Sequence, residues 1–297
     1  MVRMTPFRQR IREALANPAL QSALDKNAER RKTVRARAFA SLPEEGRPLK
    51  ARAHQIRQDV IGNLDALLET FVHNAQANGL RVHRAANAAE ARRIVLDIVQ
   101  QHNARLVAKS KSMVSEEIGL NAALEAAGVR VVETDLGEFI VQLRGEKPAH
   151  IITPAVHLRR EDVGRTFAEK LGIPYTTDVA EMNAAARRTL REVFLRADVG
   201  ISGVNFGVAE SGTLCIVTNE GNGRMVTTLP KVHIALMGME RLVPRLDDLA
   251  VMLDLLPRSA TGQKLTTYVS LLNRPRQPDD PDGPQERHVI ILDNGRG

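Results

Sequence analysis

The sequence predicts an α/β protein with a mainly parallel sheet flanked by helices and a helical extension at its N-terminus. In the first hundred residues, apolar positions recur at spacings of three and four, which is typical of helices. From Arg105 onward, short apolar segments alternate with amphipathic helices, which favours βαβ units. The composition is globular, with 43% hydrophobic and 3% aromatic residues. We therefore expect an aliphatic core.

The N-terminal region is predicted to be helical over residues 1–104 and to pack on the main domain, residues 105–297, as one structural unit. One helical face over residues 56–71 carries Ile56, Val60, Ile61, Leu64, Leu67, Leu68 and Phe71. A second amphipathic helix is expected over residues 88–102.

The main domain is predicted to alternate between strands and helices. The expected strands are residues 105–108, 128–133, 149–152, 199–202, 214–218, 233–237, 265–272 and 288–292. The expected helices are residues 115–127, 159–171 and a helix that starts at Asp178, where Glu181 completes a capping-box-like pattern.

The net charge of +7 suggests a nucleic-acid partner, but its distribution weakens that hypothesis. The basic surplus lies in residues 1–63, and its longest run is Arg30, Arg31, Lys32, Arg35 and Arg37. Such a run is usually a solvated helix face, although a docking surface for an acidic partner stays open. No nucleic acid is expected to bind.

Neither a membrane span nor a signal peptide is predicted. The apolar runs are far shorter than the roughly 20 residues that cross a bilayer, and arginines interrupt residues 1–12. The single cysteine, Cys215, excludes an intramolecular disulfide and is compatible with a reducing cytoplasm. An iron–sulfur cluster ordinarily takes about four thiolates, so no cofactor is expected in this chain.

Three segments follow strand candidates, where open α/β sheets bind ligands. The first contains Lys109, Ser110, Lys111 and Ser112. Two ammonium groups, two hydroxyls and a helix N-terminus suit a phosphate or a carboxylate. Alternatively, Ser112 simply caps the helix and the lysines are solvated.

The second segment spans residues 203–213 and packs three glycines beside a carboxylate. Glu210 is the candidate catalytic residue, as a base or a nucleophile. Asn205, Ser211, Gly212 and Thr213 are candidate binding residues of the same loop. A tight turn with an exposed glutamate is the alternative.

The third segment offers Asn219, Glu220, Gly221, Asn222 and Arg224. Its glycines and asparagines indicate a turn, and Arg224 suits an anion. A plain hairpin loop is equally compatible.

Carboxylates follow another strand, and Glu133, Asp135 and Glu138 are expected to join the same cleft. Capping of a helix by Asp135 is the structural alternative for that group.

No metal site is predicted. His150 and His157 lie too far apart for one helical turn and have no partner at a recognisable ligand spacing. His233 lies in an apolar segment, and Cys215 has apolar neighbours, so both are interpreted as core residues.

Four long segments, in order, resemble the lactate utilization protein B family: residues 107–121, 133–142, 203–213 and 218–224. The likeness extends from the basic N-terminus to residues 293–296, which is essentially the whole chain. It implies the fold class of ribose-phosphate isomerases, glucosamine-phosphate deaminases and CoA transferases. In CoA transferases a loop similar to Glu210–Thr213 carries a catalytic carboxylate.

The resemblance implies a cytoplasmic oxidoreductase subunit that helps to oxidise L-lactate to pyruvate. Its partners would be the other subunits of the complex and a small carboxylate. Family members continue into a ferredoxin-like segment that holds two [4Fe–4S] clusters. That segment is absent before Gly297, so we expect a truncated chain or an interrupted reading frame, inactive alone, and a genuine cluster-free relative stays open as the alternative. The oligomeric state is open, a homo-oligomer included.

The alternative function is a sugar-phosphate isomerase or a CoA-transferase-like enzyme with an anion-binding pocket. Such an enzyme would use Glu210 as base or nucleophile and the segment around Lys109 as its anion site.

Overall fold

The computed structural model describes residues 7–43, 48–150 and 152–297. The arginine-containing start of the chain therefore lies partly outside the described residues. No helix in the described part of the chain is long and apolar enough to cross a membrane.

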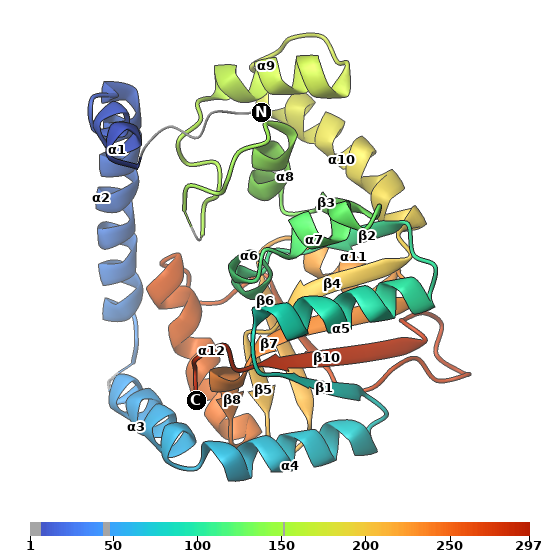
Figure 1. The fold of residues 1–297 in the computed structure, drawn as a ribbon. Helices are drawn as coiled ribbons and strands as arrows, with labels where there is room; N and C mark the ends of the chain where they lie inside the picture. The colour runs from blue at the N-terminus through green and yellow to red at the C-terminus, as the bar shows by residue number, and fades with distance from the viewer. Residues whose placement is uncertain (1–6, 44–47, 151) are drawn as a thin grey trace.

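Before the first strand, the described residues form four helices: α1 (Phe7–Leu15), α2 (Pro18–Ala40), α3 (Leu49–Gly62) and α4 (Leu64–Ala77). Asn17 begins α2 by accepting a hydrogen bond from the Leu20 amide. The apolar face predicted over residues 56–71 is divided between α3 and α4, because the chain turns at Asn63. Figure 1 shows α2 standing at one side of the molecule and α3 and α4 running along its lower edge.

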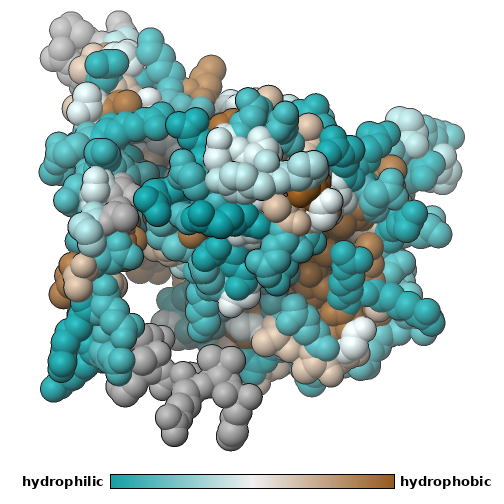
Figure 2. Space-filling view, turned by 90° about the horizontal axis from the view of Figure 1, so that it is seen from above, coloured by the Kyte–Doolittle hydropathy of each residue, from teal (hydrophilic) through white to brown (hydrophobic). Residues whose placement is uncertain are grey.

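The basic run on α2 is mainly a solvated helix face, as the charge pattern predicts. Arg30, Lys32, Arg35 and Arg37 are exposed, and the half-buried Arg31 donates to Thr153 Oγ1 at 3.4 Å. The face seen from above in Figure 2 is likewise mostly hydrophilic, with a smaller hydrophobic area on one side.

The central sheet has six parallel strands in the order β1-β10-β7-β4-β2-β3. Their bounds are β1 Arg81–Ala85, β2 Leu106–Lys109, β3 Arg130–Glu133, β4 Val199–Gly203, β7 Val232–Gly238 and β10 Glu286–Leu292. The predicted α/β class with a mainly parallel sheet is confirmed. Strand β1 comes from the N-terminal region and pairs with β10, which is the last strand of the chain.

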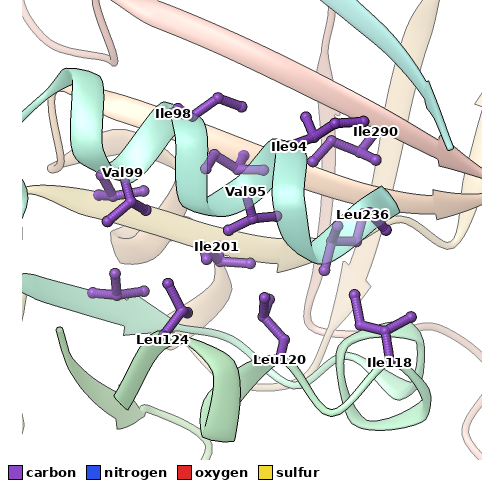
Figure 3. Packing of buried hydrophobic residues seen from close by; sticks show 14 of the residues in the cluster. Ile94, Val95, Ile98, Val99, Ile118, Leu120, Leu124, Ile201, Leu236 and Ile290 are labelled. Carbon is purple, nitrogen blue, oxygen red and sulfur yellow. The ribbon is translucent and has the colours of Figure 1, made fainter. Parts of the chain in front are cut away.

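One face of this sheet is covered by α5 (Ala88–Gln101) and α7 (Leu120–Ala126), and the short α6 (Met113–Glu117) directly precedes α7. Figure 3 shows Ile94, Val95, Ile98 and Val99 of α5 pointing toward aliphatic side chains of the strands and of α7. This cluster contains no aromatic residue, as the composition predicts.

The opposite face is covered in two parts. Toward β3 it packs on α8 (Leu136–Leu143), α9 (Arg160–Leu171), α10 (Val179–Arg196) and α11 (Asn222–Thr228). Toward β1 it packs on α4 and on a second sheet, ordered β8-β5-β6-β9. That sheet comprises β5 Phe206–Val208, β6 Thr213–Thr218, β8 Leu242–Val243 and β9 Tyr268–Leu272. A short 3-10 helix, Met239–Arg241, precedes β8, and α12 (Leu246–Ala260) packs with α3 on the outer side of this sheet.

Three local predictions differ from the structure. Residues 149, 150 and 152 lie in bends rather than a strand, and residue 151 is outside the described part. The helix predicted over 115–127 is interrupted at Gly119, whose φ of 63° is left-handed. The segment 219–224 is not a hairpin loop, since α11 begins within it at Asn222.

Strands β2 and β4 are neighbours whose following connections leave in opposite directions. The chain after β2 returns through α6 and α7 to the edge strand β3, whereas β4 leads through the second sheet and α11 to β7. The α7 and α11 helices pack on opposite faces of the sheet. A topological switch point of this kind is where open α/β sheets leave room for a ligand.

Candidate functional site

Lys109 ends β2 at the switch point, and its side chain is fully buried. Its Nζ lies 2.7 Å from Glu133 Oε1, 2.7 Å from Ser115 Oγ and 3.0 Å from Glu116 Oε1. An ammonium group has three hydrogens, and these three partners account for all of them. Lys109 is therefore a buried ion-pairing residue, and all of its ammonium hydrogens are used by protein groups.

The two carboxylates decide the charge of Lys109. Burial acts to lower the pKa of its ammonium, but Glu133 and Glu116 more than offset that effect, and the pKa is raised. Asn121 fixes Glu133 by donating from Nδ2 to Oε1 at 2.7 Å. Lys109 and Glu133 thus form a buried pair of opposite charges.

Glu138 is a third buried carboxyl group, placed against Glu133 from the first turn of α8. Burial, followed by the negative charge of Glu133, raises the pKa of Glu138 to about 9. No other group among the described residues satisfies Glu133 Oε2 or Glu138 Oε2. A proton on Glu138 allows one carboxyl to donate to the other, so the site contains a neutral acid beside a carboxylate.

Hydrogen bonds within the loop and to neighbouring segments hold the connection between β2 and α6 in place. Ser112 caps α6 by accepting from the Ser115 amide at 3.2 Å. Ser110 is buried, with its amide bonded to the Ile201 carbonyl of β4. Lys111 is half buried, and its ammonium donates to the Ile152 carbonyl at 2.9 Å. Gly203, at the end of β4, lies so close that an added Cβ would be 3.1 Å from Ser112 Oγ.

Asp135 caps α8 by accepting from the Glu138 amide at 3.1 Å, which is the structural alternative left open for it. The carboxamide of Gln142 in α8 replaces a missing strand neighbour of β3. It accepts from the Glu133 amide and donates to the Val131 carbonyl. These bonds place Glu133 and Glu138 on the same edge of the sheet.

The segment after β6 reaches the same edge. Asn222 Nδ2 lies 3.3 Å from Thr134 Oγ1, which itself donates to the Lys109 carbonyl. Partial burial and the charge of Asp135 raise the pKa of Glu220. Asn222 of the third segment therefore lies close to the end of β2, where the first segment begins.

The rest of that segment points toward the second sheet. Asn219 pairs with the carboxamide of Gln263 at 2.7 Å and accepts from the Thr267 amide. The guanidinium of Arg224 lies over the ring of Tyr268, 5.6 Å from its centre. Gly221 directly precedes α11 and has open space beside it.

Glu210 lies elsewhere, at the turn between β5 and β6. Its Oε1 accepts from the amide of Leu246 at 2.6 Å, which caps α12. Asn74 and Asn78 of α4 donate to the carbonyls of this turn, Glu210 and Ser211 included. The six residues of β6 separate the turn from Asn219, and at about 3.3 Å per residue its ends lie roughly 17 Å apart.

The other residues of the loop stabilise this turn by hydrogen bonds and packing. Ser211 Oγ donates to Thr213 Oγ1 at 2.9 Å, and Asn205 Oδ1 accepts from the Val217 amide. A Cβ at Gly212 would lie 2.3 Å from the backbone nitrogen of Ala75, so the turn packs directly on α4. The structure thus brings together the first segment, the carboxylates after β3 and Asn222, and it leaves Glu210 apart.

Sequence reasoning did not select Ser115, Glu116, Asn121, Thr134 or Gln142, although each of them holds the cluster together. The available signal was that a buried strand ending in Lys109 requires carboxylates nearby.

The chain does not fit an iron–sulfur cluster. The sequence contains a single cysteine, Cys215, and its side chain is buried in β6. Burial raises the pKa of the Cys215 thiol to about 12, which opposes the thiolate form that ligates iron.

An open parallel sheet flanked by helices, with a buried lysine–carboxylate cluster at its switch point, defines an α/β domain whose candidate ligand site lies at that edge. The LUD domain matches residues 68–292, and the chain belongs to this family.

Curated relatives are similar over nearly the whole chain. Identity is 48% over 98% of this chain with lactate utilization protein B of Macrococcus caseolyticus and 43% over 98% with that of Bacillus subtilis. An uncharacterised electron transport protein of Escherichia coli is 44% identical over 98% of this chain. The chain spans about three fifths of the length of these relatives. A crystal structure of a DUF162 family protein from Deinococcus radiodurans covers 77% of this chain and 98% of its own, at 14% identity and a TM-score of 0.43.

Proposed function

We propose that this LUD domain acts in lactate utilization, as part of a cytoplasmic assembly that oxidises L-lactate to pyruvate. The observation that carries this proposal is the identity of 43 to 48% with proteins named lactate utilization protein B over 98% of the chain. Sugar-phosphate isomerisation and CoA transfer are not favoured by these relatives.

The edge formed by Lys109, Glu133 and Glu138 is the part of the domain that we assign to this role. Oxidation of a secondary alcohol to a ketone releases two electrons and two protons. A carboxylate beside a protonated carboxyl can accept and pass on a proton, because one of the pair is charged and the other is neutral. Lys111, half buried at the same edge, is the cation that could face the carboxylate of the substrate.

The electrons require a redox group that the side chains of this chain do not provide. We propose that they pass to iron–sulfur clusters carried outside this chain, on a further segment or on partner subunits. The chain alone should therefore bind its ligand without oxidising it.

The direct test is genetic. The gene for this chain is deleted in its host, and growth is measured with L-lactate or with pyruvate as the carbon source. Growth on L-lactate should be lost and growth on pyruvate retained, with rescue by the intact gene. Unchanged growth on L-lactate in a host without another L-lactate dehydrogenase would reject the proposal.

A biochemical test separates the domain from the assembly. The purified chain is titrated with L-lactate by calorimetry and is also mixed with L-lactate and an electron-accepting dye. The proposal expects binding without dye reduction. Reduction of the dye by the chain alone would contradict the assignment of electron transfer to clusters outside it.

A further inference from the structure

We propose that His102, Glu286 and His288 form a binding site for one divalent transition-metal ion such as Zn²⁺. Glu286 and His288 lie in β10, and His102 is the C-cap of α5. Because the strands are parallel, the first residues of β1 and β10 share the edge opposite to that of Lys109. This site is therefore distinct from the proposed lactate site, and its test is independent.

The strand alternation places the donors on one face. Glu286, His288 and Ile290 follow a spacing of two, and Ile290 packs in the cluster beneath α5. The α5 helix ends above this face, which brings His102 to the same point. The imidazole of His288 is nearly fully buried, and the side chains of His102 and Glu286 are 28% and 25% exposed, so an ion could enter from solvent.

The distances match a tetrahedral ion. Glu286 Oε2 lies 3.1 Å from His102 Nε2 and 3.3 Å from His288 Nε2, and one donor atom from each of the three residues lies within 4.8 Å of the others. Bonds of about 2.0–2.1 Å at a tetrahedral angle separate two ligand atoms by roughly 3.3 Å. Two of the three edges therefore already have the required length, and a water molecule would supply the fourth ligand.

His83 supplies the second contact that a metal-binding histidine usually has. His83 Nε2 lies 3.0 Å from His288 Nδ1, and the two rings are stacked. With His288 Nε2 on the metal, its Nδ1–H would donate to His83, which would fix the tautomer and the ring orientation.

Arg81 is the competitor for this site. Its guanidinium lies 2.5 Å from Glu286 Oε2, the atom that the metal needs. The Arg81 side chain is 56% exposed and can turn into solvent when an ion replaces it. The donor set favours a metal that accepts imidazole, since Mg²⁺ and Ca²⁺ prefer oxygen ligands alone.

The experiment measures metal binding to the full chain, free of purification tags and treated with a chelator. Zn²⁺ is titrated by equilibrium dialysis with metal analysis, Co²⁺ by visible absorption, and Mg²⁺ serves as the comparison ion. We expect one equivalent of Zn²⁺, a tetrahedral Co²⁺ spectrum and no binding of Mg²⁺ at the same concentrations.

Four variants and one control variant locate the site. His102→Gln and His288→Gln should each weaken Zn²⁺ binding by roughly 100-fold, and His83→Gln by about 10-fold, as for a residue that only orients a ligand. Arg81→Gln should strengthen binding, because the competing cation is gone. His54→Gln removes an exposed imidazole of α3 and should change nothing.

Circular dichroism shows whether each variant folds. If His288→Gln does not fold, the His102→Gln variant still tests the proposal, because His102 is only half buried. The proposal is overturned if neither the wild type nor Arg81→Gln binds one equivalent of Zn²⁺. It is equally overturned if folded His102→Gln binds Zn²⁺ as tightly as the wild type.

Discussion

Glu138 lies against the ion-paired carboxylate of Glu133, and burial together with that neighbour raises the pKa of Glu138 to about 9. Glu133 in turn is 2.7 Å from the ammonium of Lys109. Three ionisable side chains from β2, β3 and α8 thus share two charges and one proton at the switch point of the sheet. This arrangement makes specific predictions for stability and function.

Replacing Glu138 with glutamine should stabilise the protein increasingly as the pH rises from about 5 to 9. The folded state holds the proton of Glu138 in this range while the unfolded state releases it, so wild-type stability falls with pH. Above the folded pKa both states are deprotonated, and the difference becomes constant at roughly a few kcal/mol. Urea unfolding of both proteins at pH 5, 7 and 9 measures it. Parallel pH profiles would show that Glu138 is not protonated in the fold.

Lys109→Met should cost about 3–5 kcal/mol in the free energy of unfolding, because it leaves the Glu133 carboxylate buried without its cation. The double variant Lys109→Met with Glu133→Gln should lose clearly less than the sum of the two single changes. Denaturant unfolding of the four proteins gives the coupling energy. Additive losses would mean that the two groups do not interact.

Gly212→Ala should destabilise the protein by roughly 2–4 kcal/mol, because its φ is 64° and the new Cβ would overlap the backbone of Ala75. Gly62→Ala is the matched control, since Gly62 ends α3 with open space around it and should tolerate the methyl group. Thermal unfolding compares the two. A similar midpoint for both variants would contradict the tight packing of the turn on α4.

Glu210→Gln keeps an oxygen that can accept from the Leu246 amide but removes the negative charge at the N-terminus of α12, so it should destabilise the protein by about 0.3–1 kcal/mol and leave ligand binding at the Lys109 edge unchanged. Calorimetric titration with L-lactate, beside denaturant unfolding, separates these effects. Loss of lactate binding with normal stability would mean that Glu210 belongs to the ligand site, and it would favour the transferase-like alternative.

The fold class and most helices and strands were predictable because the spacing of apolar residues along the sequence indicates which side of each element is buried. Helix α10 begins after Asp178, whose side chain accepts from the Glu181 amide as predicted, whereas the Asp178 amide donates to Thr176 Oγ1 instead of completing a capping box with Glu181. The order of strands was not predictable in this way. Strand β10 comes last in the chain but lies between β1 and β7, and the alternation within a strand says nothing about which neighbours it pairs with.

The contact between Lys109 and Glu133 was predictable from the sequence, and their detailed interactions were less so. Parallel strands bring their carboxyl ends to one edge, so Lys109 and Glu133 were expected to meet. The sequence did not show that Lys109 would be buried with its hydrogens shared among protein groups, because that depends on Ser115 and Glu116 in the next helix. Glu210 follows a glycine-rich pattern that resembles a catalytic loop, but the direction of β6 carries it away from that edge.

The metal-ligand candidates show the same limit. Ligand spacing within short segments of the sequence does not reveal donors that come from distant segments. His102 and Glu286 are separated by most of the domain in sequence and meet only because β10 pairs with β1 beneath α5.

The most direct measurement of the central claim compares growth on L-lactate of hosts that carry the wild type, Glu138→Gln or Glu210→Gln at equal protein levels. Glutamine preserves the neutral shape of Glu138 but cannot exchange its proton, so the account predicts a stable protein and lost growth for Glu138→Gln. It predicts growth like the wild type for Glu210→Gln. Normal growth with Glu138→Gln, or lost growth with Glu210→Gln alone, would contradict the assignment of function to the Lys109–Glu133–Glu138 edge.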